Sequence, residues 1–198
     1  MQSIPLFIGV LVFLAGCSSG PLSTTGTFLP PEHNQKLAQA KSCCSSYREV
    51  QYAKLALGQE TAAILSPESP VFDFSDGRSF FAAFELPDKS QLVAVKTYPV
   101  NMVYNPAGHV LVPAVQFLDA KHQIVETVKP SYLARNPRVI GNSWGEAEVP
   151  IPPAARYVIL LDGKLSPGLS WRDSDQRSGF LFVRSGPTGE LSVLVRGG

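Results

Sequence analysis

The chain has 198 residues, of which 17 are lysine or arginine and 16 are aspartate or glutamate, giving a formal net charge of +1. This balance disfavours a nucleic-acid-binding protein, which needs a clustered basic face. Hydrophobic residues make up 44% of the chain, enough to fill a core, so a globally disordered protein is excluded. The 17 prolines and 16 glycines fall between short apolar runs, which is typical of a turn-rich β protein.

The N-terminus carries the most specific signal. Residues 4–15 are apolar or small, a length that fits a signal peptide and is too short for the ~20 residues of a membrane-spanning helix. The run ends in Leu14-Ala15-Gly16-Cys17, which resembles the lipobox of bacterial lipoproteins, although residues 1–3 lack the usual lysine or arginine. We therefore predict a signal peptide over residues 1–16 and acylation of Cys17, for example with palmitate.

The next segment is predicted to tether a folded domain to the membrane. Residues 17–31 begin with the lipidated cysteine and continue with small, polar and helix-breaking residues, which predicts a flexible tether of roughly 20 Å. Residues 32–41 are rich in good helix formers and follow Pro31, so we expect a short helix there.

Residues 47–57 are ambiguous, and we assign residues 32–57 to the short helix and a connecting segment. Ser46 and Glu49 have the spacing of a capping box, which favours a helix. Val50 and Tyr52, however, do not lie on one helical face, so helix and extended structure are equally favoured.

Two neighbouring cysteines, Cys43 and Cys44, remain if Cys17 is lipidated. Free thiols tend not to persist in an oxidising periplasm, so we put forward a vicinal disulfide. Adjacent Cα atoms are only ~3.8 Å apart, closer than in most disulfides, and free thiols or an intermolecular bridge are the alternatives. A zinc site is disfavoured because zinc-binding cysteine pairs are usually spaced by two or more residues.

From Pro70 onward, short apolar runs alternate with turn residues. Asp76-Gly77 separates two of these runs and predicts a hairpin. The run 146–151 is flanked by prolines, so we expect an edge strand there. The pattern predicts a mostly β chain with an antiparallel β-sandwich over residues 58–198. The predicted strands cover residues 71–74, 78–86, 92–98, 110–118, 124–128, 146–151, 156–161, 180–183 and 191–195.

Residues 141–145 match the G-x-S-x-G motif of serine hydrolases around Ser143. That motif needs a helix after the serine and a histidine later in the chain. Instead, Pro150, Pro152 and Pro153 follow after a short segment, and all three histidines precede Ser143. We interpret the match as a chance occurrence in a loop and predict no catalytic residue.

Two metal-site patterns are also weak, so we predict no metal and no cofactor. Residues 73–77 look like the start of a calcium loop, but the glycine comes one position early and Phe84 stands where the loop needs glutamate. His109 and His122 could meet across neighbouring strands, yet no cysteine or carboxylate pair is spaced to complete a metal shell.

Two tryptophans, Trp144 and Trp171, lie in polar surroundings that suggest loops. Exposed aromatic faces beside hydrogen-bonding groups commonly hold small polar-apolar ligands, sugars among them. We therefore name both as sugar-stacking candidates. The alternative is that each indole caps one end of the sandwich core.

Several patterned segments together resemble the maltose-operon periplasmic protein family. They are Ser42-Cys43-Cys44 and residues 69–87, 110–128 and 155–163, with the most specific pieces at residues 84–87 and 117–119. The resemblance implies a periplasmic β protein encoded beside maltodextrin transport genes. It implies no reaction and no binding residues. The lipobox-like sequence is a departure from that family.

These observations predict a lipoprotein of the bacterial outer membrane that faces the periplasm, since Ser18 and Ser19 lack the aspartate that favours inner-membrane retention. We expect a non-enzymatic accessory of maltose and maltodextrin uptake, held to the membrane by its lipid. The alternative is a structural or protein-interaction module of the cell envelope that pairs through a sheet edge or an apolar patch. Maltodextrins or envelope proteins are the expected partners, and nucleic acid is not.

Overall fold

The computed structural model describes residues 30–100, 109–135, 144–164, 169–171 and 181–198. Within these ranges the chain begins with helix α1 (Pro30–Gln39) and the short 3-10 helix η1 (Tyr47–Glu49). The strands that follow are β1 (Ala53–Lys54), β2 (Glu60–Leu65), β3 (Val71–Phe74), β4 (Gly77–Glu85), β5 (Ser90–Tyr98), β6 (His109–Val110), β7 (Pro113–Leu118), β8 (Ile124–Val128), β9 (Leu133–Arg135), β10 (Trp144–Pro150), β11 (Tyr157–Asp162), β12 (Leu169–Trp171), β13 (Leu181–Ser185) and β14 (Gly189–Gly197).

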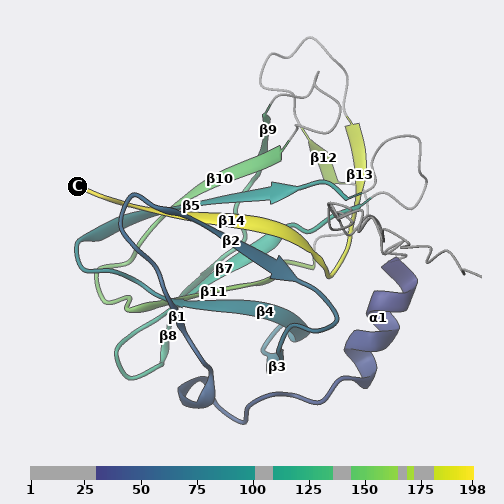
Figure 1. The fold of residues 1–198 in the computed structure, drawn as a ribbon, viewed down its shortest axis with the longest axis horizontal. Helices are drawn as coiled ribbons and strands as arrows, with labels where there is room; N and C mark the ends of the chain where they lie inside the picture. The colour runs from purple at the N-terminus through teal and green to yellow at the C-terminus, as the bar shows by residue number, and fades with distance from the viewer. Residues whose placement is uncertain (1–29, 101–108, 136–143, 165–168, 172–180) are drawn as a thin grey trace, which may run out of the picture.

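The strands form two main sheets that pack as a sandwich. Sheet I has the order β1-β4-β11-β7-β8, with β3 paired to β4, and sheet II has the order β2-β14-β5-β10-β9. Figure 1 shows β2, β14 and β5 in one layer and β4, β11 and β7 in the other. A small sheet, β12-β13-β6, stands apart from both. Most pairs are antiparallel, and β1–β4 is a parallel pair in sheet I. The predicted mostly β, antiparallel sandwich is confirmed.

The main core lies between the two sheets. Alternation along β5 turns Val93 and Val95 inward, and both are 0% exposed. They belong to one cluster with Phe117 of β7 and Leu160 of β11, which are also fully buried. Burying apolar surface is the main force that holds such a fold together, so these inward positions secure the sandwich.

A second apolar cluster covers the outer face of sheet I. Phe72 and Phe74 of β3 pack with Phe81 of β4, and Ile159 of β11 lies in the same cluster. The segment that precedes β1 closes over them: the Tyr47 and Phe72 ring centroids are 4.8 Å apart, and Val50, Cys44 and Tyr52 join the cluster. The N-terminal segment is therefore a cover for sheet I, and Leu37, Val50 and Leu55 are buried core residues.

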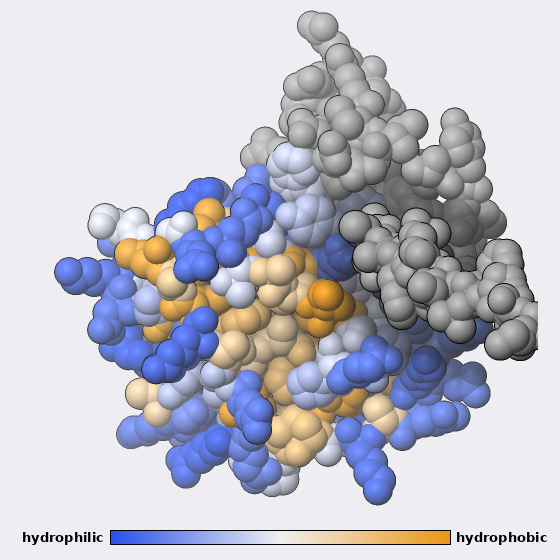
Figure 2. Space-filling model, viewed as in Figure 1, coloured by the Kyte–Doolittle hydropathy of each residue, from blue (hydrophilic) through white to orange (hydrophobic). Residues whose placement is uncertain are grey.

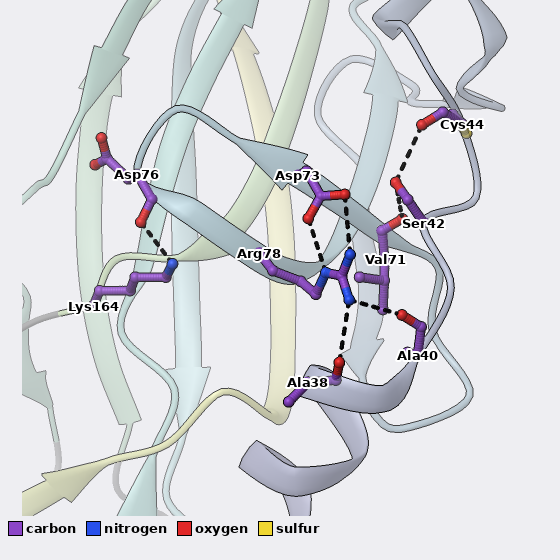
Figure 3. A network of polar contacts seen from close by, with 9 residues as sticks. All are labelled: Ala38, Ala40, Ser42, Cys44, Val71, Asp73, Asp76, Arg78 and Lys164. Carbon is purple, nitrogen blue, oxygen red and sulfur yellow. Dashed lines mark hydrogen bonds and ion pairs between the residues drawn. The ribbon is translucent and has the colours of Figure 1, made fainter.

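Helix α1 is fastened to the sandwich near both of its ends, and Figure 3 shows the contacts of Arg78 near the C-terminal end. Near the C-terminal end, the Arg78 guanidinium donates hydrogen bonds to the carbonyl oxygens of Ala38 and Ala40, at 3.2 and 3.0 Å. The same side chain forms an ion pair with Asp73, with Nε 2.8 Å from Oδ1. Near the N-terminal end, His33 Nδ1 lies 2.6 Å from Thr188 Oγ1, at the turn before β14.

The predicted elements mostly match the observed ones. The helix begins two residues early, β3 and β8 have the predicted bounds, and the predicted strand 110–118 is divided into β6 and β7. The hairpin between β3 and β4 is present, with Gly77 at φ 105°, a conformation that favours glycine. The ambiguous stretch 47–57 contains η1 and β1, and the Ser46 side chain makes no capping hydrogen bond to the backbone.

The prediction that residues 146–151 form an edge strand is wrong. β10 lies inside sheet II, between β5 and β9, because β9 pairs with its first three residues. The prolines at its end are tolerated because the residues after Glu146 pair only with β5. Strands β1, β2, β9 and β12 were not predicted.

Candidate functional site

The outer face of sheet II differs from that of sheet I because most of the large side chains that point outward from it are polar, aromatic or exposed. Alternation turns one residue in two outward on each strand, while their neighbours, such as Thr97 and Val193, are buried. We call this surface the open face. Its outward residues include Glu60, Ala62 and Ile64 of β2; Glu190, Ser192, Leu194 and Arg196 of β14; Lys96 and Tyr98 of β5; Trp144, Glu146 and Glu148 of β10; and Leu133 of β9.

The strand register sets these side chains side by side. Ser192 is paired with Ala62 on one side and with Lys96 on the other, and Lys96 is paired with Glu146. One step along the strands, Glu190 is paired with Ile64 and with Tyr98. Four strands, distant in sequence, therefore contribute to one surface.

A polar network occupies the middle of the open face. Lys96 Nζ lies 3.0 Å from both carboxylate oxygens of Glu60, and the Ser192 hydroxyl donates a hydrogen bond to the same carboxylate. Tyr98 Oη is 3.3 Å from Ser192 Oγ, which joins it to the network. These contacts hold the four side chains in a fixed arrangement.

Glu60 and Lys96 stabilise each other's charged forms. Hydrogen bonds from Ser192 and then from Lys96 lower the pKa of Glu60, and the hydrogen bond to Glu60 raises the pKa of Lys96. Both groups therefore remain charged around neutral pH, whereas a catalytic base or acid works best with a pKa near the operating pH. The arrangement suits the binding of a polar ligand better than proton transfer.

Trp144 stands at one side of this network, where β10 begins. Lys96 Nζ lies 5.9 Å from the centroid of its ring, within the range of a cation–π contact. The indole is half-buried, and its N–H has no hydrogen-bond acceptor among the described residues. Trp144 is therefore part of a strand on the open face, not of a loop as the sequence suggested.

The second predicted sugar-stacking residue, Trp171, lies elsewhere. It ends β12 and is paired with Leu181 of β13, in the small sheet. The structure therefore does not bring the two tryptophans into one sheet. It also places Trp171 in a strand, which corrects the prediction of a loop.

A small cavity of about 80 Å³ lies at the β2 side of the open face. Ile64 and Glu190 of the open face line it together with Val100, His109 and Thr188. The Thr188 hydroxyl is the group that bonds His33 of α1. Burial first, and then the nearby His109 and Lys36, lower the pKa of His33, so that it is neutral in this setting.

The other residues that the sequence singled out for a metal site make contacts that stabilise the fold. Asp73 is paired with Arg78, His122 stacks on Tyr157 with ring centroids 4.5 Å apart, and His109 is buried in β6. Within the described residues, no group of three or more histidine, cysteine, aspartate or glutamate side chains could hold a metal ion.

Cys43 and Cys44 form a disulfide in the cover of sheet I. Cys17 and Ser143 lie outside the described residues, as do the predicted signal peptide and most of the predicted tether. No helix in the described part of the chain is long and apolar enough to cross a membrane.

Sequence reasoning found Trp144 but missed the network beside it. Lys96 and Tyr98 could have been placed on a polar face by the alternation in residues 92–98. Glu60 and Ser192 could not, because their proximity depends on the pairing of β2 with β14 and of β14 with β5. Comparisons of the chain with known protein families, curated proteins and solved structures found no match.

Proposed function

We propose that this chain is a non-enzymatic lipoprotein of the bacterial outer membrane that faces the periplasm and binds carbohydrate on its open face, as an accessory of maltodextrin uptake. The observation that carries the binding proposal is Trp144 beside the network of Glu60, Lys96 and Ser192. An aromatic ring next to fixed donors and acceptors matches the apolar faces and hydroxyl groups of a sugar. The lipobox-like sequence that ends at Cys17 supports the location.

Calorimetric titration tests the binding proposal. We use the mature chain from residue 17 with Cys17→Ala, which keeps every described residue, and titrate it with a maltodextrin mixture. Trp144→Ala should abolish the heat of binding, and Trp171→Ala is the matched control, because it lies in another sheet. Binding that survives Trp144→Ala, or that is lost only in Trp171→Ala, contradicts the assignment of the open face.

Cell fractionation tests the location. The full chain should be recovered with the outer membrane, and Cys17→Ala should be released into the soluble fraction. A Cys17→Ala variant that stays with the membrane contradicts acylation of Cys17.

A protein-interaction module is the second candidate, and β8 favours it. This strand ends sheet I, its residues are almost all exposed, and Ile124 and Val125 are 47% and 38% exposed. An edge strand with exposed apolar side chains can pair with a strand of another protein. A photo-crosslinking residue at Val125 should then capture a defined envelope protein in cells, while the same group at exposed Lys54 of β1 should not.

A further inference from the structure

The open face has apolar side chains at both sides of its polar centre. Trp144 lies on β10, and Ile64, which is 63% exposed, lies three strands away on β2. Neighbouring strands are about 4.8 Å apart, so about 14 Å separate the two positions. Figure 2 shows hydrophobic atoms gathered over the region where Figure 1 places β2, with hydrophilic atoms around them.

Hydrogen-bonding groups fill the interval between these two side chains. Tyr98 of β5 and Glu190 of β14 are paired with each other, and Glu190 is paired with Ile64. The Ser192 hydroxyl, bonded to Glu60 and Tyr98, lies one step along the strands. A ligand that spans the interval therefore meets an aromatic ring, then polar groups, then an aliphatic side chain.

The β2 side of the open face continues into a hollow. The cavity of about 80 Å³ is lined by Ile64 and Glu190 of this face and by Val100, His109 and Thr188. It offers room for the end of an elongated ligand.

The charges of the open face select against an anionic ligand. Four carboxylates and two cations lie on it among the side chains that the structure describes, namely Glu60, Glu146, Glu148, Glu190, Lys96 and Arg196. Lys96 is bound to Glu60 and Arg196 to Glu148. Among these described side chains the carboxylates are in the majority.

We propose that the open face binds an uncharged oligosaccharide longer than a disaccharide, laid across the strands from Trp144 to Ile64 with one end at the cavity beside His109. This inference rests on the proposed carbohydrate-binding function and adds to it the length, the direction and the charge of the ligand.

The test is a chain-length series measured by calorimetry on the mature chain with Cys17→Ala. Affinity should rise at least several-fold from maltose to maltotriose and maltohexaose. Ile64→Ser should lower the affinity for maltohexaose several-fold and leave that for maltose unchanged. Ile124→Ser, a similarly exposed isoleucine on β8, is the matched control and should change neither.

Each outcome of the series decides the inference. Equal affinity for all lengths overturns the inference. So does an Ile64→Ser effect that is the same for maltose and maltohexaose, or absent for both. If Trp144→Ala still abolishes binding in these cases, the proposed carbohydrate binding stands. No binding of any sugar overturns the proposed function as well. An acidic oligosaccharide of matched length, such as an oligogalacturonate, should bind more weakly than the neutral one, and tighter binding overturns the charge argument.

Discussion

The two sheets of the sandwich share one core, but their outer faces differ in composition and in exposure. The outer face of sheet I carries Phe72, Phe74 and Phe81, and the N-terminal segment packs over it with Tyr47 and Tyr52. The outer face of sheet II carries Glu60, Lys96, Tyr98 and Trp144, and much of it is exposed. The protein therefore covers one face itself and leaves the other open to solvent, because only the first would expose large apolar surface without its cover.

The largest expected effect comes from the covered face. Phe72 is 7% exposed and packs against Tyr47, so Phe72→Ala should lower the free energy of unfolding by about 3 kcal/mol or more. Ile64→Ala, on the open face, is the matched control and should change it by no more than about 0.5 kcal/mol. Urea denaturation measures both, and equal losses would show that the two faces do not differ as described.

The attachment of α1 should depend on Arg78. Arg78→Ala removes the hydrogen bonds to the carbonyl oxygens of Ala38 and Ala40, so the amides of α1 should exchange with solvent several-fold faster. Arg196→Ala, which removes an ion pair on the open face, is the control and should leave exchange in α1 unchanged. Hydrogen exchange with mass spectrometry measures both variants, and unchanged protection of α1 in Arg78→Ala would contradict this role.

Acidification should loosen the same helix at its other end. Burial lowers the pKa of His33 below its ordinary value of 6.5, with further lowering by His109 and Lys36 and opposition from Glu32 and Glu68. At a pH between the pKa of His33 in the folded chain and 6.5, the unfolded chain binds more protons than the folded chain. The stability that neutral His33 contributes is therefore complete above pH 6.5 and is lost as the pH falls through this range. His33→Gln removes the titration, and its stability should fall less than that of the native chain between about pH 7.5 and about pH 5. Equal pH dependence of the two chains would contradict the prediction.

The disulfide should have the smallest effect on stability. A bridge between adjacent residues closes almost no loop, so its reduction should change the free energy of unfolding by less than about 1 kcal/mol. In the chain with Cys17→Ala, intact mass should show no alkylation before reduction and two alkyl groups after it. Uptake of two groups without a reductant would mean that Cys43 and Cys44 are free thiols.

Strands with strong local patterns could be predicted from the sequence, and those that depend on their partners could not. The aromatic and β-branched residues of β3 and β8, which favour strands, are visible in the sequence itself. By contrast, β2 has the sequence ETAAIL, whose alanines and glutamate are uncommon in strands, and it is held by its pairing with β14. The position of β10 was mistaken for the same reason, since the three-residue strand β9 carries no pattern of its own.

In the candidate site, too, some residues could be predicted from the sequence and others could not. Trp144 could be singled out because an aromatic residue in polar surroundings is recognisable in sequence. Its neighbours Glu60 and Ser192 are 132 residues apart and come together only through the register of sheet II. The cover over sheet I was equally hidden, because Tyr47, Val50 and Tyr52 follow no helical or strand period.

The most direct test of this account is a map of backbone amide shifts in an NMR titration of the mature chain, carrying Cys17→Ala, with maltohexaose. The account predicts shifts concentrated in β2, β14, β5 and β10, with β4, β11 and β7 of the covered sheet unchanged. Shifts that map to sheet I, or no shifts at saturating sugar, would contradict the claim that the open face is the binding surface.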